Sequence, residues 1–121
     1  MIKVLLVDDH PMVRQSLRNV LDAYADVEIV AEAADGESAI TAVKQWRPSV
    51  VVMDIRMPGI NGIEATAIIR ALYPTIQIVG LSVNAEEENQ QLMSMAGAHT
   101  LMAKEIAVEH LYDAICDAAR R

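Results

Sequence analysis

The sequence has little cysteine and no long hydrophobic run, and each shortage excludes a class of protein. Its single cysteine, Cys116, has no partner for an internal disulfide, which fits a reducing cytoplasm. The apolar run at residues 2–7 is too short for a signal peptide or a membrane span. We therefore expect a cytoplasmic protein that has no membrane-spanning segment and does not act at a membrane.

Positive charge is scarce as well. Ten Lys and Arg residues stand against seventeen Asp and Glu residues, which leaves a formal net charge of −7. A protein that binds nucleic acid needs a basic surface to neutralise phosphates, and no basic stripe runs through this sequence. We therefore expect no direct binding of nucleic acid. The Gly-x-Gly-x-x-Gly fingerprint of a dinucleotide-binding domain is also missing.

The remaining composition favours one packed domain. Hydrophobic residues make up 53% of the 121 residues and charged residues 22%, a balance typical of a globular fold. The length is that of one ordinary domain. We expect residues 1–121 to form that domain, and we expect no output domain within this sequence.

Five short apolar runs alternate with five segments of helical periodicity. The run at residues 50–53 is continuous and rich in β-branched residues, which is typical of a strand buried on both faces of a parallel sheet. The alternation predicts an α/β fold with a right-handed doubly wound sheet and helices on both faces. The predicted strands are residues 3–7, 27–31, 50–53, 76–81 and 100–103.

The residues that start and stop helices predict several boundaries. Pro11 is expected to begin the first helix, Asp35 and Gly36 to open the second, and Gly97 to cap the fourth. The apolar residues predicted to share one face of the first helix are Val13, Leu17, Val20, Leu21 and Tyr24.

Polar residues follow four of the five predicted strands. The ligand site of a doubly wound sheet lies at the carboxyl ends of its strands, so these side chains should converge on one rim. Each of them alone is often a helix cap, a turn former or a solvated surface residue. Three acids on one small rim repel one another unless something neutralises them, so the joint pattern predicts a functional site. The residues are Asp8, Asp9, Asp54, Ser82 and Lys104.

The chemistry of this set points to phosphoryl transfer. Clustered carboxylates suit a hard divalent cation such as Mg²⁺, which is usually bound by one or two carboxylates, waters and phosphate oxygens. Ser82 offers a hydrogen-bond donor and Lys104 a positive charge, and both suit phosphoryl oxygens. Asp54 can itself be a nucleophile that forms an acyl phosphate.

Together these residues resemble the receiver domain of two-component response regulators. The resemblance covers essentially the whole chain and implies a CheY-like fold with five parallel strands in the order 2-1-3-4-5. The matching motifs are Val7-Asp8-Asp9-His10-Pro11, Met53-Asp54-Ile55-Arg56-Met57-Pro58-Gly59 with Gly62, Leu81-Ser82, and Gly97-Ala98 followed by Lys104.

The resemblance implies a role for each site residue. Asp54 is the expected phosphoacceptor, Ser82 binds a phosphoryl oxygen, and Lys104 pairs with the phosphoryl group. Mg²⁺ is expected to be bound by Asp54 and Asp9 directly, by Asp8 mainly through water, and by the backbone carbonyl of Arg56. Such a domain catalyses its own phosphorylation and dephosphorylation without being an enzyme in the ordinary sense.

The resemblance also implies partners. The phosphoryl donor is a phosphohistidine of a sensor histidine kinase, and phosphorylation can drive formation of a homodimer. The Asp-Asp-His-Pro opening and Lys104-Glu105, where many relatives have Lys-Pro, are most similar to the NarL/FixJ-type branch. Members of that branch usually regulate transcription through a helix-turn-helix output domain after the receiver.

Several positions differ from the family pattern. Many members have Tyr or Phe three residues before the lysine, whereas this chain has Leu101, which calls the usual relay through a rotating aromatic ring into question. Val83 and Arg56 are larger than the small residues that leave a path open for water, so we expect them to slow loss of the phosphoryl group. We interpret His10 and His99 as surface or loop histidines and not as ligands.

Other functions fit the sequence less well. An FMN protein of the same fold needs a Ser/Thr/Gly-rich phosphate loop where this chain has Asp8-Asp9-His10-Pro11. A haloacid-dehalogenase-like phosphatase has an Asp-x-Asp pattern after its first strand and a much longer chain. A pseudo-receiver that is never phosphorylated and acts only as an interaction module remains the alternative.

Overall fold

The computed structural model describes residues 1–83 and 86–121, and in that part of the chain five strands alternate with five helices. No helix within the described ranges has both the length and the apolar character needed to cross a membrane. The elements in chain order are β1 (Ile2–Val7), α1 (Pro11–Asp22), β2 (Val27–Ala33), α2 (Gly36–Trp46), β3 (Val50–Asp54), α3 (Gly62–Leu72), β4 (Gln77–Ser82), α4 (Glu87–Ala96), β5 (Thr100–Ala103) and α5 (Lys104–Ala119).

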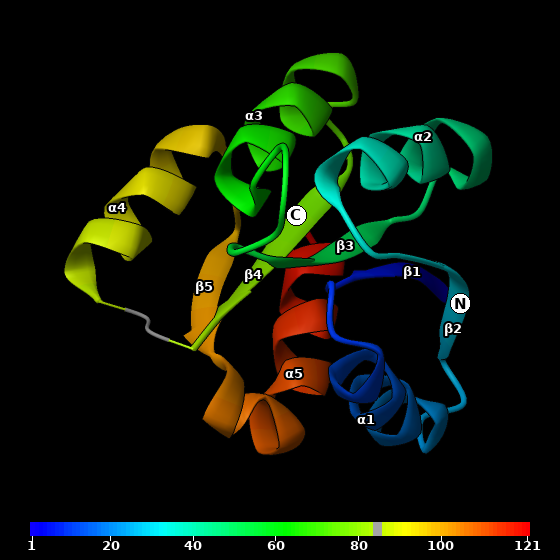
Figure 1. Ribbon diagram of the computed structural model, residues 1–121. Coiled ribbons are helices and arrows are strands. Elements are labelled where there is room, and N and C mark those ends of the chain that lie inside the picture. Colours follow the sequence, from blue (N-terminus) through cyan, green and yellow to red (C-terminus); the bar gives the residue numbers. More distant parts are fainter. Residues whose placement is uncertain (84–85) are drawn as a thin grey trace.

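The strands form one parallel sheet in the order β2-β1-β3-β4-β5, as the resemblance implied. Figure 1 shows α1 and α5 on one face of this sheet, with α2, α3 and α4 on the other. The chain passes from β1 to β2 on one side and then back past β1 to β3 on the other, which is the point where the winding reverses. The predicted doubly wound fold is confirmed.

The sheet separates two hydrophobic cores. Alternate residues of β3 point to opposite faces, so Val51 and Met53 lie in the core under α2, α3 and α4. Val50 and Val52 lie in the core under α1 and α5. All five residues of β3 are buried, which explains why this strand has a continuous apolar sequence that ends in one acid, Asp54.

Most predicted boundaries are close to those observed, and the largest errors lie at the edge strand and after the first helix. β2 extends two residues beyond the predicted run, to Ala33, and most of its residues are only partly buried. The prediction for Tyr24 was wrong, because α1 ends at Asp22 and Tyr24 lies in the turn that leads to β2. Its ring instead stacks on Tyr112 of α5, with ring centroids 3.6 Å apart.

The helix caps fix the loops between strands and helices at both ends of the sheet. Pro11 is in the first turn of α1, and Asp35 accepts a hydrogen bond from the Ser38 N–H at 2.7 Å at the start of α2. Gly97 ends α4 with a φ of 103°, a conformation that favours glycine. All three predicted boundaries are confirmed.

The loop from β3 to α3 is held close to Asp54 by Gly62. The Gly62 N–H donates to the Ile55 carbonyl at 2.8 Å, which brings the start of α3 against the end of β3. A Cβ at position 62 would overlap the backbone carbonyl oxygen of Asp54. Only glycine therefore fits there without moving this loop, which also contains Arg56.

Candidate functional site

The structure brings the predicted residues together at the carboxyl ends of the strands. Lys104 Nζ, at the start of α5, lies 2.8 Å from Asp8 Oδ2 after β1 and 3.3 Å from Asp54 Oδ2 at the end of β3. Ser82 is buried at the end of β4, one residue beyond Leu81, the ladder partner of Asp54. Because Ser82 also pairs with Ala103 of β5, its position lies between Asp54 and Lys104.

Asp8 is buried and has partners for both carboxylate oxygens. Its Oδ1 accepts a hydrogen bond from the His10 backbone N–H at 2.8 Å, and its Oδ2 accepts one from Lys104 Nζ. The Asp8 backbone carbonyl accepts a further bond from the Arg14 guanidinium. This carboxylate is therefore held in a fixed orientation, and a buried charge is tolerated because it is paired and hydrogen-bonded.

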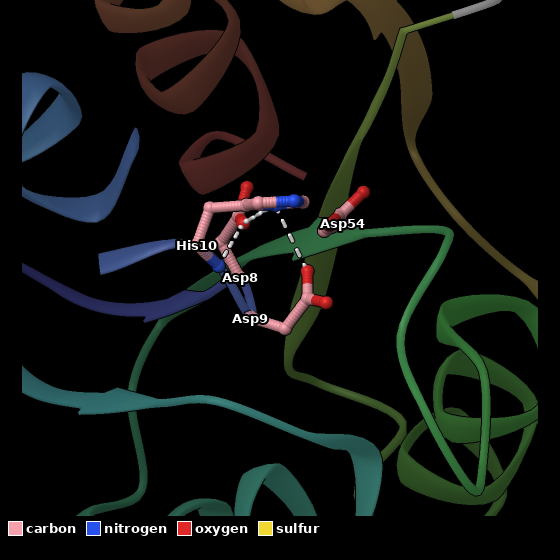
Figure 2. Close-up of side chains that lie close together, drawn as sticks. All are labelled: Asp8, Asp9, His10 and Asp54. Atoms are coloured by element: carbon pink, nitrogen blue, oxygen red, sulfur yellow. Dashed lines mark hydrogen bonds and ion pairs between the residues drawn. The ribbon is translucent and has the colours of Figure 1, made fainter. Parts of the chain in front are cut away.

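Asp9 and His10 complete a compact acidic group, which Figure 2 shows with Asp8 and Asp54. One potential ligand atom from each of these four residues lies within 4.8 Å of every other. His10 Nδ1 is 3.0 Å from Asp8 Oδ1 and 3.0 Å from Asp9 Oδ1. The interpretation of His10 was correct in that the residue lies in a loop and is largely exposed, but it missed the contact of the ring with both acids.

Two buried oxygens of this group make no hydrogen bond within residues 1–83 and 86–121. They are Asp9 Oδ1 and Asp54 Oδ2. A buried acceptor without a hydrogen bond costs roughly 1–3 kcal/mol, and more when it is charged. An all-oxygen set of this kind is what Mg²⁺ prefers, so the donors of the site fit a divalent cation.

The electrostatics of the metal-free site oppose ionisation of Asp54. Burial of this carboxyl, and next the negative charge of Asp8, raise the pKa of Asp54 to about 6. Lys104 acts in the opposite direction but does not cancel these effects. Burial also lowers the pKa of Lys104, but its hydrogen bond to Asp8 and its proximity to Asp54 raise it further, so the net shift is upward and the side chain stays an ammonium.

Of the positions that differ from the family pattern, Arg56 contacts this group directly. The Arg56 N–H donates to Asp54 Oδ1 at 3.3 Å, while its side chain is exposed. Val83 is 80% exposed, so most of its side chain faces solvent. Leu101 is buried in the core under α4, next to Met93, and its backbone carbonyl accepts a hydrogen bond from Gln90. The interior position of Leu101 is filled by an aliphatic side chain and not by a ring.

His99 also has a partner that the sequence did not predict. Its Nε2 lies 2.7 Å from Asp117 Oδ2, which joins the start of β5 to the end of α5. The two residues are eighteen positions apart, and they meet because α5 runs back antiparallel to β5. His99 therefore belongs to a separate pair and not to the acidic group, although His99 and His10 both contact carboxylates.

Comparison with protein families gives a match over nearly the whole chain. The family model described as the response regulator receiver domain matches residues 4–116. The curated relatives include the uncharacterised transcriptional regulatory protein YxjL of Bacillus subtilis, 40% identical over 98% of this chain and 55% of its own. The response regulator UvrY of Escherichia coli is 37% identical over 95% of this chain and 53% of its own. The chain spans about half the length of the curated relatives it matches.

Solved structures agree with the observed fold. A LuxR-family two-component response regulator from Aurantimonas superposes with a TM-score of 0.95 at 32% identity, over 99% of this chain and 86% of the other. The receiver domain of the putative response regulator NarL of Mycobacterium tuberculosis gives a TM-score of 0.93 at 28% identity, over 98% and 96% of the two chains. The fold that brings these strand ends together is therefore shared with these proteins.

Proposed function

The chain belongs to the family of response regulator receiver domains, and from this membership we propose that Asp54 accepts a phosphoryl group from a phosphohistidine with the help of bound Mg²⁺. The observation that carries the proposal is the state of Asp54. This carboxylate is buried, its Oδ2 makes no hydrogen bond within the described residues, and Lys104 Nζ lies 3.3 Å away. An oxygen so placed is available to form a bond.

The proposed reaction exchanges one bond to phosphorus for another. A carboxylate oxygen of Asp54 forms the new bond as the bond between phosphorus and the imidazole nitrogen of the donor breaks. Bound Mg²⁺ would neutralise the negative charge that gathers on the phosphoryl oxygens. Lys104 already faces Asp54 Oδ2 and is positioned to pair with the incoming group, and Ser82, buried beside it, would bind another phosphoryl oxygen.

The site residues would bind the ion in different ways, some directly and one through water. Asp9 Oδ1, which lacks a hydrogen bond in the described structure, and the second carboxylate oxygen of Asp54 would bind Mg²⁺ directly, with the backbone carbonyl of Arg56 as a third protein ligand. Asp8 would act mainly through water, because its two oxygens already accept hydrogen bonds from the His10 N–H and from Lys104. The two hydrogen bonds of Asp8 and the unbonded oxygen of Asp9 therefore support the metal ligands that the resemblance implied.

The donor would dock beside the acceptor, over α1 and α5. Asp54 is buried, so a kinase must contact the rim of the site to bring its phosphohistidine close. Exposed apolar side chains lie there, with Met12 on α1 at 84% exposure and Val108 on α5 at 62%. Between these two helices lies a cavity of about 270 Å³ that reaches Lys104. We propose this surface as the docking site of a sensor histidine kinase in the cytoplasm.

The output of the domain is proposed from its relatives. Since the relatives YxjL, GacA and UvrY are named transcriptional or response regulators and are about twice as long, we propose that this receiver controls transcription through a helix-turn-helix domain outside the present sequence. With a net charge of −7, the receiver itself is not expected to contact DNA.

The acceptor is tested with Asp54→Asn. The amide has nearly the same shape as the carboxylate but is not a nucleophile, so it should fold and take up no phosphoryl group from phosphoramidate with Mg²⁺, as measured by intact-protein mass spectrometry. Asp113→Asn, at an exposed position of α5, is the matched control and should be labelled like the wild type. Equal labelling of Asp54→Asn and wild type would refute the assignment, and absence of labelling in the wild type would favour a pseudo-receiver.

Self-association is tested separately. Beryllofluoride with Mg²⁺ mimics the phosphorylated state, and we expect it to shift the wild type from monomer to dimer in sedimentation at micromolar concentration, but to leave Asp54→Asn monomeric. An unchanged mass for the wild type would count against a phosphorylation-dependent homodimer.

A further inference from the structure

His10 lies against two carboxylates that it cannot satisfy at once. Its Nδ1 is 3.0 Å from Asp8 Oδ1 and 3.0 Å from Asp9 Oδ1. A ring nitrogen carries one hydrogen at most, and only the contact with Asp8 has the geometry of a hydrogen bond. Asp9 Oδ1 is buried and makes no hydrogen bond among the described residues. The contact of Nδ1 with Asp9 Oδ1 therefore lacks the geometry of a hydrogen bond.

The distance between His10 Nδ1 and Asp9 Oδ1 suits two ligands of one metal ion. Ligand atoms about 2.1 Å from a shared ion lie about 3.0 Å apart at the right angles of an octahedral site and about 3.4 Å apart at tetrahedral angles, and opposite octahedral ligands lie about 4.2 Å apart. The contact of His10 Nδ1 with Asp9 Oδ1 has the shorter spacing. A ligand atom of Asp54 lies within 4.8 Å of both, close to the spacing of opposite ligands.

The local backbone holds the imidazole in this position. The His10 N–H donates to Asp8 Oδ1, and His10 is the N-cap residue of α1. Its side chain makes no capping hydrogen bond, so binding an ion would not disturb the helix start. The side chain is 62% exposed, whereas Asp8 and Asp54 are almost fully buried. The imidazole therefore borders the entrance of the acidic group, where an arriving ion meets it first.

An imidazole changes which ions the group prefers. Mg²⁺ is bound almost entirely by oxygen, whereas imidazole nitrogen suits Zn²⁺, Co²⁺, Ni²⁺ and Cu²⁺, and affinity for such mixed sites rises along the divalent series toward copper. We propose that His10 Nδ1, Asp9 and Asp54 form a site for a transition-metal ion such as Zn²⁺, which competes with Mg²⁺ for the acceptor group. This inference rests on the proposed function, since a bound Zn²⁺ would occupy the position that Mg²⁺ needs.

The other histidines of the chain provide a contrast. His99 contacts one carboxylate, that of Asp117, and His110 lies 3.9 Å from one carboxylate, that of Glu109. Neither belongs to a group of three potential ligands among the described residues. His110 is exposed to a similar degree as His10, so His110→Ala is a matched control for loss of an exposed histidine beside an acid.

The test measures metal binding and not phosphorylation. Zn²⁺ and Mg²⁺ are titrated into wild type, His10→Ala and His110→Ala by calorimetry, and ¹⁵N-histidine spectra report the ring nitrogens during the Zn²⁺ titration. We expect Zn²⁺ to displace Mg²⁺ from the wild type and to shift the Nδ1 signal of His10. The ratio of Zn²⁺ to Mg²⁺ affinity should fall by about tenfold or more in His10→Ala, as expected for loss of a nitrogen ligand, and stay unchanged in His110→Ala.

Two results would overturn the proposal. One is a Zn²⁺ to Mg²⁺ affinity ratio in His10→Ala equal to that of the wild type, and the other is Zn²⁺ binding that leaves His10 Nδ1 unshifted. The proposed function fails in a different way, if the wild type with Mg²⁺ takes up no phosphoryl group. Zn²⁺ binding that depends on His10 would still support the metal site in that case.

Discussion

At the scale of single residues, Asp54 combines burial with negative charge. It is 3% exposed, and burial and the charge of Asp8 raise its pKa to about 6 without metal. The unfolded chain has the ordinary carboxyl pKa of 3.8. Between these pH values the folded state binds the proton more tightly than the unfolded chain, so the contribution of Asp54 to stability falls as the pH rises from about 4 to about 6 and is then constant.

We therefore predict that Asp54→Asn stabilises the metal-free protein at pH 7. A shift of this size corresponds to about 3 kcal/mol of unfolding free energy, taken as an order of magnitude. The gain over wild type should be small at pH 4, grow up to about pH 6 and then level off. Urea unfolding in EDTA across this pH range measures it. A gain that is the same at pH 4 and pH 7 would show that Asp54 does not titrate as described.

Lys104 should have the opposite effect on stability. It hydrogen-bonds Asp8 and lies beside Asp54, so Lys104→Met leaves two buried carboxylates without their cation. We expect a loss of about 1–3 kcal/mol in metal-free urea unfolding at pH 7. Combining Lys104→Met with Asp54→Asn should recover part of this loss. Lys44→Met, at an exposed position of α2, is the control and should change stability little.

The residues of the site differ in how far the sequence could predict them. The acids, the serine and the lysine follow strands whose hydrophobic pattern is clear, so their convergence could be predicted from the carboxyl-end rule. The position of the His10 ring could not, because it depends on the turn that Asp8 Oδ1 stabilises through the His10 N–H. The sequence signal was present in the order Asp-Asp-His-Pro, but exposure alone does not show which way a ring points.

At the scale of elements, the start of α3 controls the loop after Asp54. A Cβ at Gly62 would overlap the Asp54 carbonyl oxygen, so Gly62→Ala must push α3 and the loop with Arg56 away from the site. We expect Gly62→Ala to weaken Mg²⁺ binding by about tenfold and to destabilise the fold by about 1–3 kcal/mol, typical of overpacking. Calorimetry and urea unfolding measure the two effects.

Gly59 in the same loop allows the effect of backbone strain to be measured without the steric overlap that a Cβ causes at Gly62. It has a φ of 74°, which disfavours alanine, but a Cβ there would meet open space. Gly59→Ala should therefore cost only about 1 kcal/mol and leave Mg²⁺ affinity nearly unchanged. If both alanine variants weakened Mg²⁺ binding equally, the contact of Gly62 with Asp54 would not be the reason.

Elements with a strong pattern were predicted well, and those that depend on distant partners were not. The buried strand β3 has a continuous apolar sequence, so its position was clear. β2 is an edge strand whose residues are mostly half-buried, and its last two residues have no such pattern. Tyr24 matched the spacing of an α1 face, but it lies in a turn. Its ring stacks on that of Tyr112, eighty-eight residues later in the chain.

At the scale of the whole molecule, the proposed Mg²⁺ would link the site to stability. We predict that Mg²⁺ binds the folded site and not the unfolded chain, so it should raise the melting temperature, with a gain in unfolding free energy of about 2.7 kcal/mol at a concentration of 100 times Kd. Thermal unfolding measured against Mg²⁺ concentration tests this. Asp9→Ala should remove most of the increment. NaCl at equal ionic strength is the control for screening of the net charge of −7 and should give a smaller rise.

The division of the interior by the sheet has a consequence for how such a chain can diverge. No described side chain belongs to both hydrophobic cores, since one lies under α1 and α5 and the other under α2, α3 and α4. Substitutions that share no neighbours are close to additive in their effect on stability. A lineage could thus alter the packing beneath α1 and α5, the helices proposed to face a kinase, without compensating changes beneath α4. Partner choice and the core that contains Leu101 could then change almost independently of each other.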